Sequence, residues 1–104
     1  MIHVAVMYPK TADSTFDFDY YLTKHMPMVR ERLAPSGLTG TQVDEGMGGG
    51  APGEPSPYMV ICTLIFDTMA GFQNGMAAHG AELIGDVPNF TNVQPTIQVS
   101  RSRD

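Results

Sequence analysis

Nine consecutive residues at Tyr58–Phe66 (YMVICTLIF) are apolar almost without a break. A strand in an antiparallel sheet with one face in water alternates apolar and polar side chains, because only one of its faces is covered. This segment does not alternate, so it predicts a strand that needs cover on both faces. Any architecture for the chain has to supply those two covers.

The rest of the pattern predicts three further strands and two helices. In chain order, the expected elements are a strand at Ile2–Tyr8, a helix from about Thr15 to Leu33, strands at Leu38–Glu45 and Tyr58–Phe66, a helix that begins after Asp67 or Thr68, and a strand at Asn92–Ser100. The segment 46–57 (GMGGGAPGEPSP) is a flexible loop by composition. This order predicts an α+β, ferredoxin-like βαββαβ fold, in which two helices lie on one face of a four-stranded antiparallel sheet. We expect one domain over residues 1–104.

Two helices cover only one face of such a sheet. The other face of the strands at 2–8 and 58–66 would expose a large apolar patch, which monomers rarely tolerate. A second copy of the same sheet is the simplest cover. We therefore expect a homodimer in which two sheets pack face to face and close towards a barrel.

Both predicted helices contain residues that disfavour helices. Thr15 or Asp17 can cap the first helix, and Pro27 inside it removes a hydrogen bond to the carbonyl of Thr23 and should kink the helix. The second helix contains four glycines between residues 71 and 85, so we expect it to be broken or short.

The charge balance excludes several classes of partner. Eleven acidic and six scattered basic residues give a net charge of -5, which weighs against binding to nucleic acid or to anionic membranes. No run approaches the roughly 18 apolar residues of a membrane span, and the first ten residues do not resemble a signal peptide. We expect a cytoplasmic protein. Its one cysteine, Cys62, lies in the middle of an apolar strand, where core packing is the expected role.

The strongest candidate for chemistry is His25. It belongs to an apolar stripe at helical spacing, formed by Phe18, Leu22, His25, Val29 and Leu33. Tyr21 lies four residues earlier, so the two side chains are neighbours. Histidine titrates near neutral pH and acts as a general acid or base. The alternative is a core histidine that is hydrogen-bonded to a carbonyl group.

The remaining motifs give no site. His3 either lines the subunit interface or has its hydrogen bonds satisfied on its own strand face. His79 and Glu82 share a helical face, but two ligands do not make a metal site. We therefore expect no metal and no cofactor. The sequence leaves a non-covalent haem open. The segment 48–53 (GGGAPG) formally matches the dinucleotide-binding pattern G-x-G-x-x-G, but it precedes a strand and does not open a helix.

Two segments of the chain resemble the EthD family. Residues 8–28 (YPKTADSTFDFDYYLTKHMPM) are similar to the family signature, in which a strand ends in Tyr-Pro and Phe-Asp precedes a Tyr-Tyr-x-x-x-His-x-Pro helix, and residues 86–100 (DVPNFTNVQPTIQVS) resemble the closing segment. Met28 departs from the pattern, because an aliphatic residue such as leucine is usual there. The resemblance implies a dimeric α+β barrel with a cavity between sheet and helices in each subunit, and it makes the helix histidine, here His25, the best functional candidate.

Two functions are compatible with this resemblance. The family is named for a component of ethyl tert-butyl ether degradation, where a cytochrome P450 system performs the oxidation, and related barrels include cofactor-free quinol monooxygenases, muconolactone isomerase and polyketide cyclases. The first function is an enzyme in which His25 moves a proton to or from a small hydrophobic or aromatic ligand, while Tyr21 orients the ligand or stabilises an oxyanion. The expected pocket walls are Phe18, Leu22, Met26, Tyr58, Phe66, Phe72 and Met76. The second is a non-catalytic protein that holds a hydrophobic substrate or product, or that assists an oxygenase partner such as a cytochrome P450.

Overall fold

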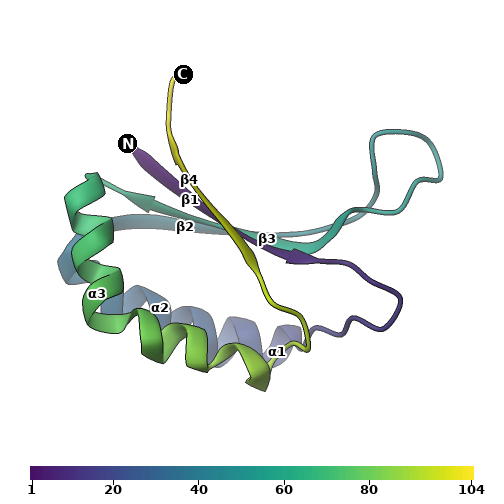
Figure 1. The fold of residues 1–104 in the computed structure, drawn as a ribbon, viewed down its shortest axis with the longest axis horizontal. Helices are drawn as coiled ribbons and strands as arrows, with labels where there is room; N and C mark the ends of the chain where they lie inside the picture. Colours follow the sequence, from purple (N-terminus) through teal and green to yellow (C-terminus); the bar gives the residue numbers. More distant parts are fainter.

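The structure, a computed structural model, describes residues 1–104 and contains one four-stranded antiparallel sheet. The strands are β1 (Ile2–Pro9), β2 (Leu38–Glu45), β3 (Tyr58–Phe66) and β4 (Thr96–Arg101), in the spatial order β2-β3-β1-β4. The helices α1 (Phe18–Tyr20), α2 (Met26–Leu33) and α3 (Met69–Gly85) all lie on one side of the sheet (Figure 1). The predicted ferredoxin-like α+β fold is confirmed.

The two faces of the sheet differ in their cover. On the helix side, alternate residues of β1 and β3 are buried, including Val4, Tyr8, Val60, Cys62, Leu64 and Phe66. The intervening residues of β3, such as Ile61 and Ile65, are only half-buried, and no helix lies on their side of the sheet (Figure 1). Within one chain, the helices therefore bury one face of β3 and leave its other face without a packing partner.

The first helical segment is irregular. It begins at Phe18, because the Asp17 carboxylate accepts a hydrogen bond from the backbone N–H of Tyr20. A π-helical turn at Tyr21–His25 then separates α1 from α2. This wider turn accommodates Pro27 at the start of α2, since proline lacks the N–H that a regular α-helix would use and its ring would clash with the preceding turn.

The π turn changes which residues face the sheet. Tyr21, His25 and Met26 are buried against it, followed by Val29 and Leu33. Leu22, which regular helical spacing places on the buried stripe, is 49% exposed. The predicted stripe is therefore wrong at this position, because one extra residue in the turn rotates the helix face that precedes it.

The second helix is longer than predicted. α3 runs without a break for 17 residues, and the Thr68 side chain caps it by accepting a hydrogen bond from the N–H of Gly71. A Cβ atom on Gly71 would lie 2.2 Å from the carbonyl oxygen of Ser36, and one on Gly75 would lie 3.0 Å from the Ser36 side chain. These glycines allow close helix packing, so the predicted break is wrong. No helix is long and apolar enough to cross a membrane.

The segment between α3 and β4 ties the sheet to the start of the first helical segment. Phe16 pairs with Thr91 in an isolated β-bridge, and the hydroxyl of Thr91 donates to the carbonyl of Thr15 at 2.7 Å. β4 begins at Thr96 and not at Asn92 as predicted. Pro95 cannot donate a ladder hydrogen bond, and the Asn92 side chain bonds instead to the loop that precedes α1.

Candidate active site at the end of the first helical segment

An apolar cavity of about 60 Å³ lies between the helices and the helix side of the sheet. Its walls include Tyr8 from β1, Cys62 from β3, Met26 from α2 and Met76 from α3, and twelve of its fourteen lining residues are hydrophobic. His25 is the only lining residue of a type that titrates near neutral pH. The cavity therefore places one acid–base group in an apolar environment.

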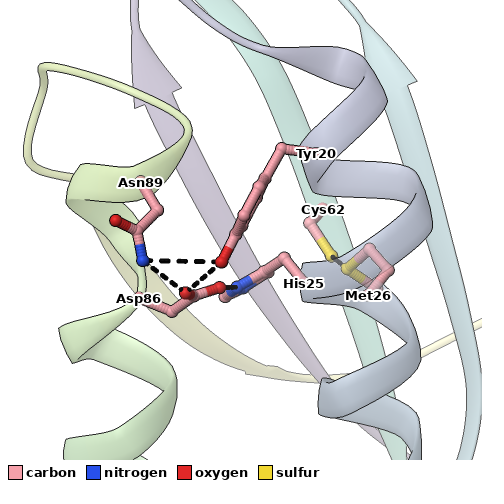
Figure 2. Close-up of polar contacts among 6 residues, drawn as sticks. All are labelled: Tyr20, His25, Met26, Cys62, Asp86 and Asn89. Carbon is pink, nitrogen blue, oxygen red and sulfur yellow. Dashed lines mark hydrogen bonds and ion pairs between the residues drawn. The ribbon is translucent and has the colours of Figure 1, made fainter.

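His25 is bound to a carboxylate from the other helical segment. Its Nδ1 atom lies 2.8 Å from Oδ2 of Asp86, the residue that directly follows α3. The other carboxylate oxygen of Asp86 accepts hydrogen bonds from the hydroxyl of Tyr20 at 2.7 Å and from the amide of Asn89 at 2.8 Å. Figure 2 shows Asp86 at the centre of this cluster, with Tyr20 and His25 reaching it from one side and Asn89 from the other. We call these four residues the Asp86 cluster.

The Asp86 cluster determines the tautomer of His25. Partial burial raises the pKa of Asp86, but the hydrogen bonds from Tyr20, Asn89 and His25 outweigh it and leave the pKa of this carboxyl below its ordinary value. An ionised carboxylate only accepts hydrogen bonds, so the proton of a neutral His25 must be on Nδ1. No protein group is hydrogen-bonded to Nε2, which therefore carries a free lone pair.

Aromatic rings hold the imidazole in place. The ring of Tyr21 stacks on His25 with a centroid distance of 5.3 Å and an interplanar angle of 17°, and Phe90 lies 4.6 Å away. Phe90 also contacts Tyr21 and Tyr8 in edge-to-face geometry, so the site is one end of an aromatic cluster. With 6% of its surface exposed, His25 is shielded from bulk water.

The other polar groups of the cavity remain protonated. Burial raises the pKa values of the Tyr8 and Tyr21 phenols and of the Cys62 thiol above their ordinary values. At neutral pH the two phenols are therefore hydrogen-bond donors. The Cys62 thiol, which lies 3.9 Å from the sulfur of Met26, is unsuited to nucleophilic attack.

The structure brings together some of the predicted site residues and separates others. His25, Tyr21, Met26 and Met76 line the cavity, whereas Phe18, Leu22, Tyr58, Phe66 and Phe72 do not. Leu22 faces outward because of the π turn. Phe66 and Phe72 pack on each other, with ring centroids 5.5 Å apart, and Phe18 packs on Phe16. Tyr58 lies at the hairpin end of β3.

Sequence reasoning missed the partners of His25 in the Asp86 cluster. One physical signal was available: a carboxylate directly after a helix faces the negative end of the helix dipole, so Asp86 is unfavourable there without a specific partner. Tyr20 gave no signal of its own, because its direction depends on the π turn that follows it.

The other histidines lie outside the cavity. Glu82, the supposed partner of His79, instead accepts a hydrogen bond from Nε of Arg32 at 3.0 Å. His3 lies on the sheet face that carries no helix, opposite Ile65. No group of three or more His, Cys, Asp or Glu side chains is arranged to hold a metal ion.

Comparison with known proteins gives a family and a fold. The EthD domain family matches residues 9–94, whereas no curated protein sequence shows significant similarity. An EthD-like protein from Ralstonia eutropha JMP134 is 40% identical and superposes with a TM-score of 0.92 over 99% of this chain and 92% of that chain.

More distant structures share the fold alone. An EthD family protein from Bacillus halodurans C-125 is 20% identical, with a TM-score of 0.67 over 98% of both chains. A protein from Shewanella loihica PV-4 that is provisionally assigned as a monooxygenase is 15% identical, with a TM-score of 0.64 over 99% of this chain and 94% of that chain. From the match over residues 9–94 and the 40% identity over nearly the whole length, the chain belongs to the EthD domain family.

Proposed function

We propose that this protein is an enzyme in which His25 acts as a general base and acid on a small hydrophobic or aromatic substrate bound in the cavity. The observation that carries the proposal is the 2.8 Å contact between Nδ1 of His25 and the Asp86 carboxylate, which leaves the lone pair of Nε2 for a substrate. Nε2 takes a proton from a weakly acidic C–H or O–H group, and the resulting imidazolium is stabilised by Asp86.

The tyrosines supply the complementary function. When His25 removes a proton, negative charge develops on an oxygen atom of the substrate, and the protonated phenols of Tyr21 and Tyr8 are the donors in the lining that can stabilise it. One acid–base group contributes roughly two to four powers of ten in rate. This suits isomerisation, cyclisation, dehydration or cofactor-free oxygenation of an activated substrate, and it does not suffice for attack on an unactivated C–H bond.

We propose further that the active form is a cytoplasmic homodimer. The half-buried residues on the helix-free face of β1 and β3 support a pairing of two sheets, because a second copy would complete the cover that β3 needs. Light scattering at micromolar concentration should give twice the mass of the 11.3 kDa chain. A monomeric mass would contradict the dimeric barrel.

The experiment that tests the enzyme compares two histidine variants. A panel of enolisable ketones and substituted phenols is incubated in deuterated water, and NMR follows deuterium incorporation or conversion. His25→Gln should lose about a hundredfold to ten-thousandfold in rate, whereas His79→Gln, which alters a histidine outside the cavity, should not change it. Equal rates in wild type and His25→Gln would exclude the mechanism. Binding without turnover of any compound would favour the alternative, a ligand-binding protein that assists an oxygenase partner.

A further inference from the structure

The cavity is partly open to the surface, and the residues at its opening are apolar. Nine of the fourteen lining residues are buried, His25 among them, and the other five reach the surface. Two of these five, Ile84 on α3 and Ile97 on β4, are 51% and 45% exposed. We call Ile84 and Ile97 the rim. No charged side chain belongs to the part of the lining that reaches the surface.

Exposed aliphatic residues at a cavity mouth indicate a binding surface. Of the six large hydrophobic residues that are most exposed in the chain, two form the rim, while Met1, Leu22, Met47 and Met69 lie outside the cavity lining. Single exposed apolar residues are ordinary, but a pair that continues an apolar cavity to the surface forms one continuous patch. Such a patch gains free energy when an apolar group covers it.

The volume limits what reaches His25. The cavity, at about 60 Å³, is less than half the size of an apolar cavity of roughly 150 Å³ that binds benzene. A group of a few heavy atoms, such as the head of a methyl ketone, fits beside His25 without rearrangement. A larger ligand, one with an aromatic ring included, has to extend through the opening. Ile84 and Ile97 are the most exposed of the lining residues, so a ligand that extends to the surface contacts the rim.

We propose that the rim binds the uncharged apolar tail of an elongated ligand whose small polar head lies beside His25. The position of the head rests on the proposed function, while the position of the tail rests on the exposure of Ile84 and Ile97. The ligand class is a slender molecule with a carbonyl or similar head and an alkyl chain. No Lys, Arg, Asp or Glu lines the cavity, so no charged side chain there recognises an anionic or a cationic tail.

A second copy of the chain is not the expected occupant of the rim. In the sheet register Ile97 is opposite Val6, and both line the cavity on the helix side. The sheet face proposed to pair in the homodimer is the opposite one, which carries His3 and Ile61. Dimerisation through that face leaves the rim open.

The test measures binding as a function of tail length. Straight-chain 2-alkanones from 2-butanone to 2-decanone are titrated into the protein by NMR or calorimetry. Affinity should rise about twofold to fourfold per methylene group while the tail covers the rim, the upper value corresponding to full burial of each methylene. Ile84→Gln and Ile97→Thr keep residues that suit a helix and a strand, and each should reduce this increment to below about 1.5-fold.

Control variants separate this inference from the proposed function. Met69→Gln alters a comparably exposed residue outside the cavity and should keep the wild-type increment per methylene. His25→Gln should also keep it, even though turnover is lost. Affinity that does not depend on chain length would overturn the proposal, and so would an increment that survives both rim substitutions. Rim substitutions that changed the oligomeric mass and not the increment would assign the rim to a subunit contact, which also overturns it.

Discussion

The first helical segment and α3 both contain residues that disfavour helices, yet only the first departs from regular α-helical geometry. α3 has four glycines between Gly71 and Gly85 and remains a regular helix of 17 residues. The segment from Phe18 to Leu33 has one proline and breaks its regularity with a π turn. A glycine costs about 1 kcal/mol of helix propensity, which close packing can offset, whereas the ring and missing N–H of proline require a change in geometry.

That change in geometry is what builds the site. The π turn lets two consecutive tyrosines serve different purposes: Tyr20 reaches Asp86, while Tyr21 stacks on His25 inside the cavity. The regular helix contributes Asp86 from just beyond its end. The irregular segment thus presents the reacting group, and the regular one supplies a fixed partner for it.

The largest expected effect comes from the residue at which the two segments meet. Asp86→Asn keeps the shape of the side chain but removes the charge that fixes Nδ1–H of His25, so turnover should fall by about a hundredfold to ten-thousandfold. Nitrogen NMR of His25 should show a mixture of tautomers in the variant and one tautomer in the wild type. Asp44→Asn, at an exposed position on β2, serves as the control. Unchanged activity in Asp86→Asn would mean that the contact is only structural.

Glycine substitutions test whether packing explains the regularity of α3. Gly71→Ala places a methyl group 2.2 Å from the carbonyl oxygen of Ser36, so the helix must move, and we expect a loss of about 1–3 kcal/mol in the free energy of unfolding. Gly85→Ala meets nothing within 4 Å and should be neutral or stabilising by up to about 1 kcal/mol. Denaturant unfolding of both variants measures the difference. Equal stabilities would show that the glycines have no packing role.

Removal of the Tyr20 hydroxyl tests how much its hydrogen bond to Asp86 contributes to turnover. Tyr20→Phe should reduce turnover less than Asp86→Asn does, because Asn89 still donates to the same carboxylate oxygen. The hydrogen bond to Asp86 raises the pKa of Tyr20 above its ordinary value, so Asp86→Asn should lower it again. Ultraviolet titration of the phenol measures this shift. A Tyr20 pKa that did not respond to Asp86→Asn would show that the bond is absent in solution.

The sequence predicted the sheet and the candidate histidine but not the partners of that histidine. Strand positions depend on local patterns of apolar residues, and β2 and β3 were predicted with the observed bounds. In the Asp86 cluster, His25 and Tyr20 contact a residue that lies 61 and 66 positions further along the chain, and no local pattern encodes these contacts. Leu22 and the glycines of α3 were misjudged for related reasons, since a π turn and a close helix contact both depend on tertiary packing that propensities do not include.

The smallest expected effect is a pH dependence of stability that belongs to Asp86. Its pKa is lower in the folded chain than in the unfolded chain, so the unfolded state binds its proton first as the pH falls. The stabilisation is complete above the ordinary pKa near 3.9, and it decreases as the pH falls through the lowered value in the folded state. The advantage of wild type over Asp86→Asn in the free energy of unfolding should therefore shrink as the pH falls below about 4, the ordinary carboxyl range. Because the carboxylate is partly exposed, the change is small, and chemical denaturation of both proteins at matched pH values has to resolve it. An advantage that grew as the pH fell below about 4 would reverse the sign of the shift and contradict the ionised state of Asp86 on which the tautomer of His25 depends.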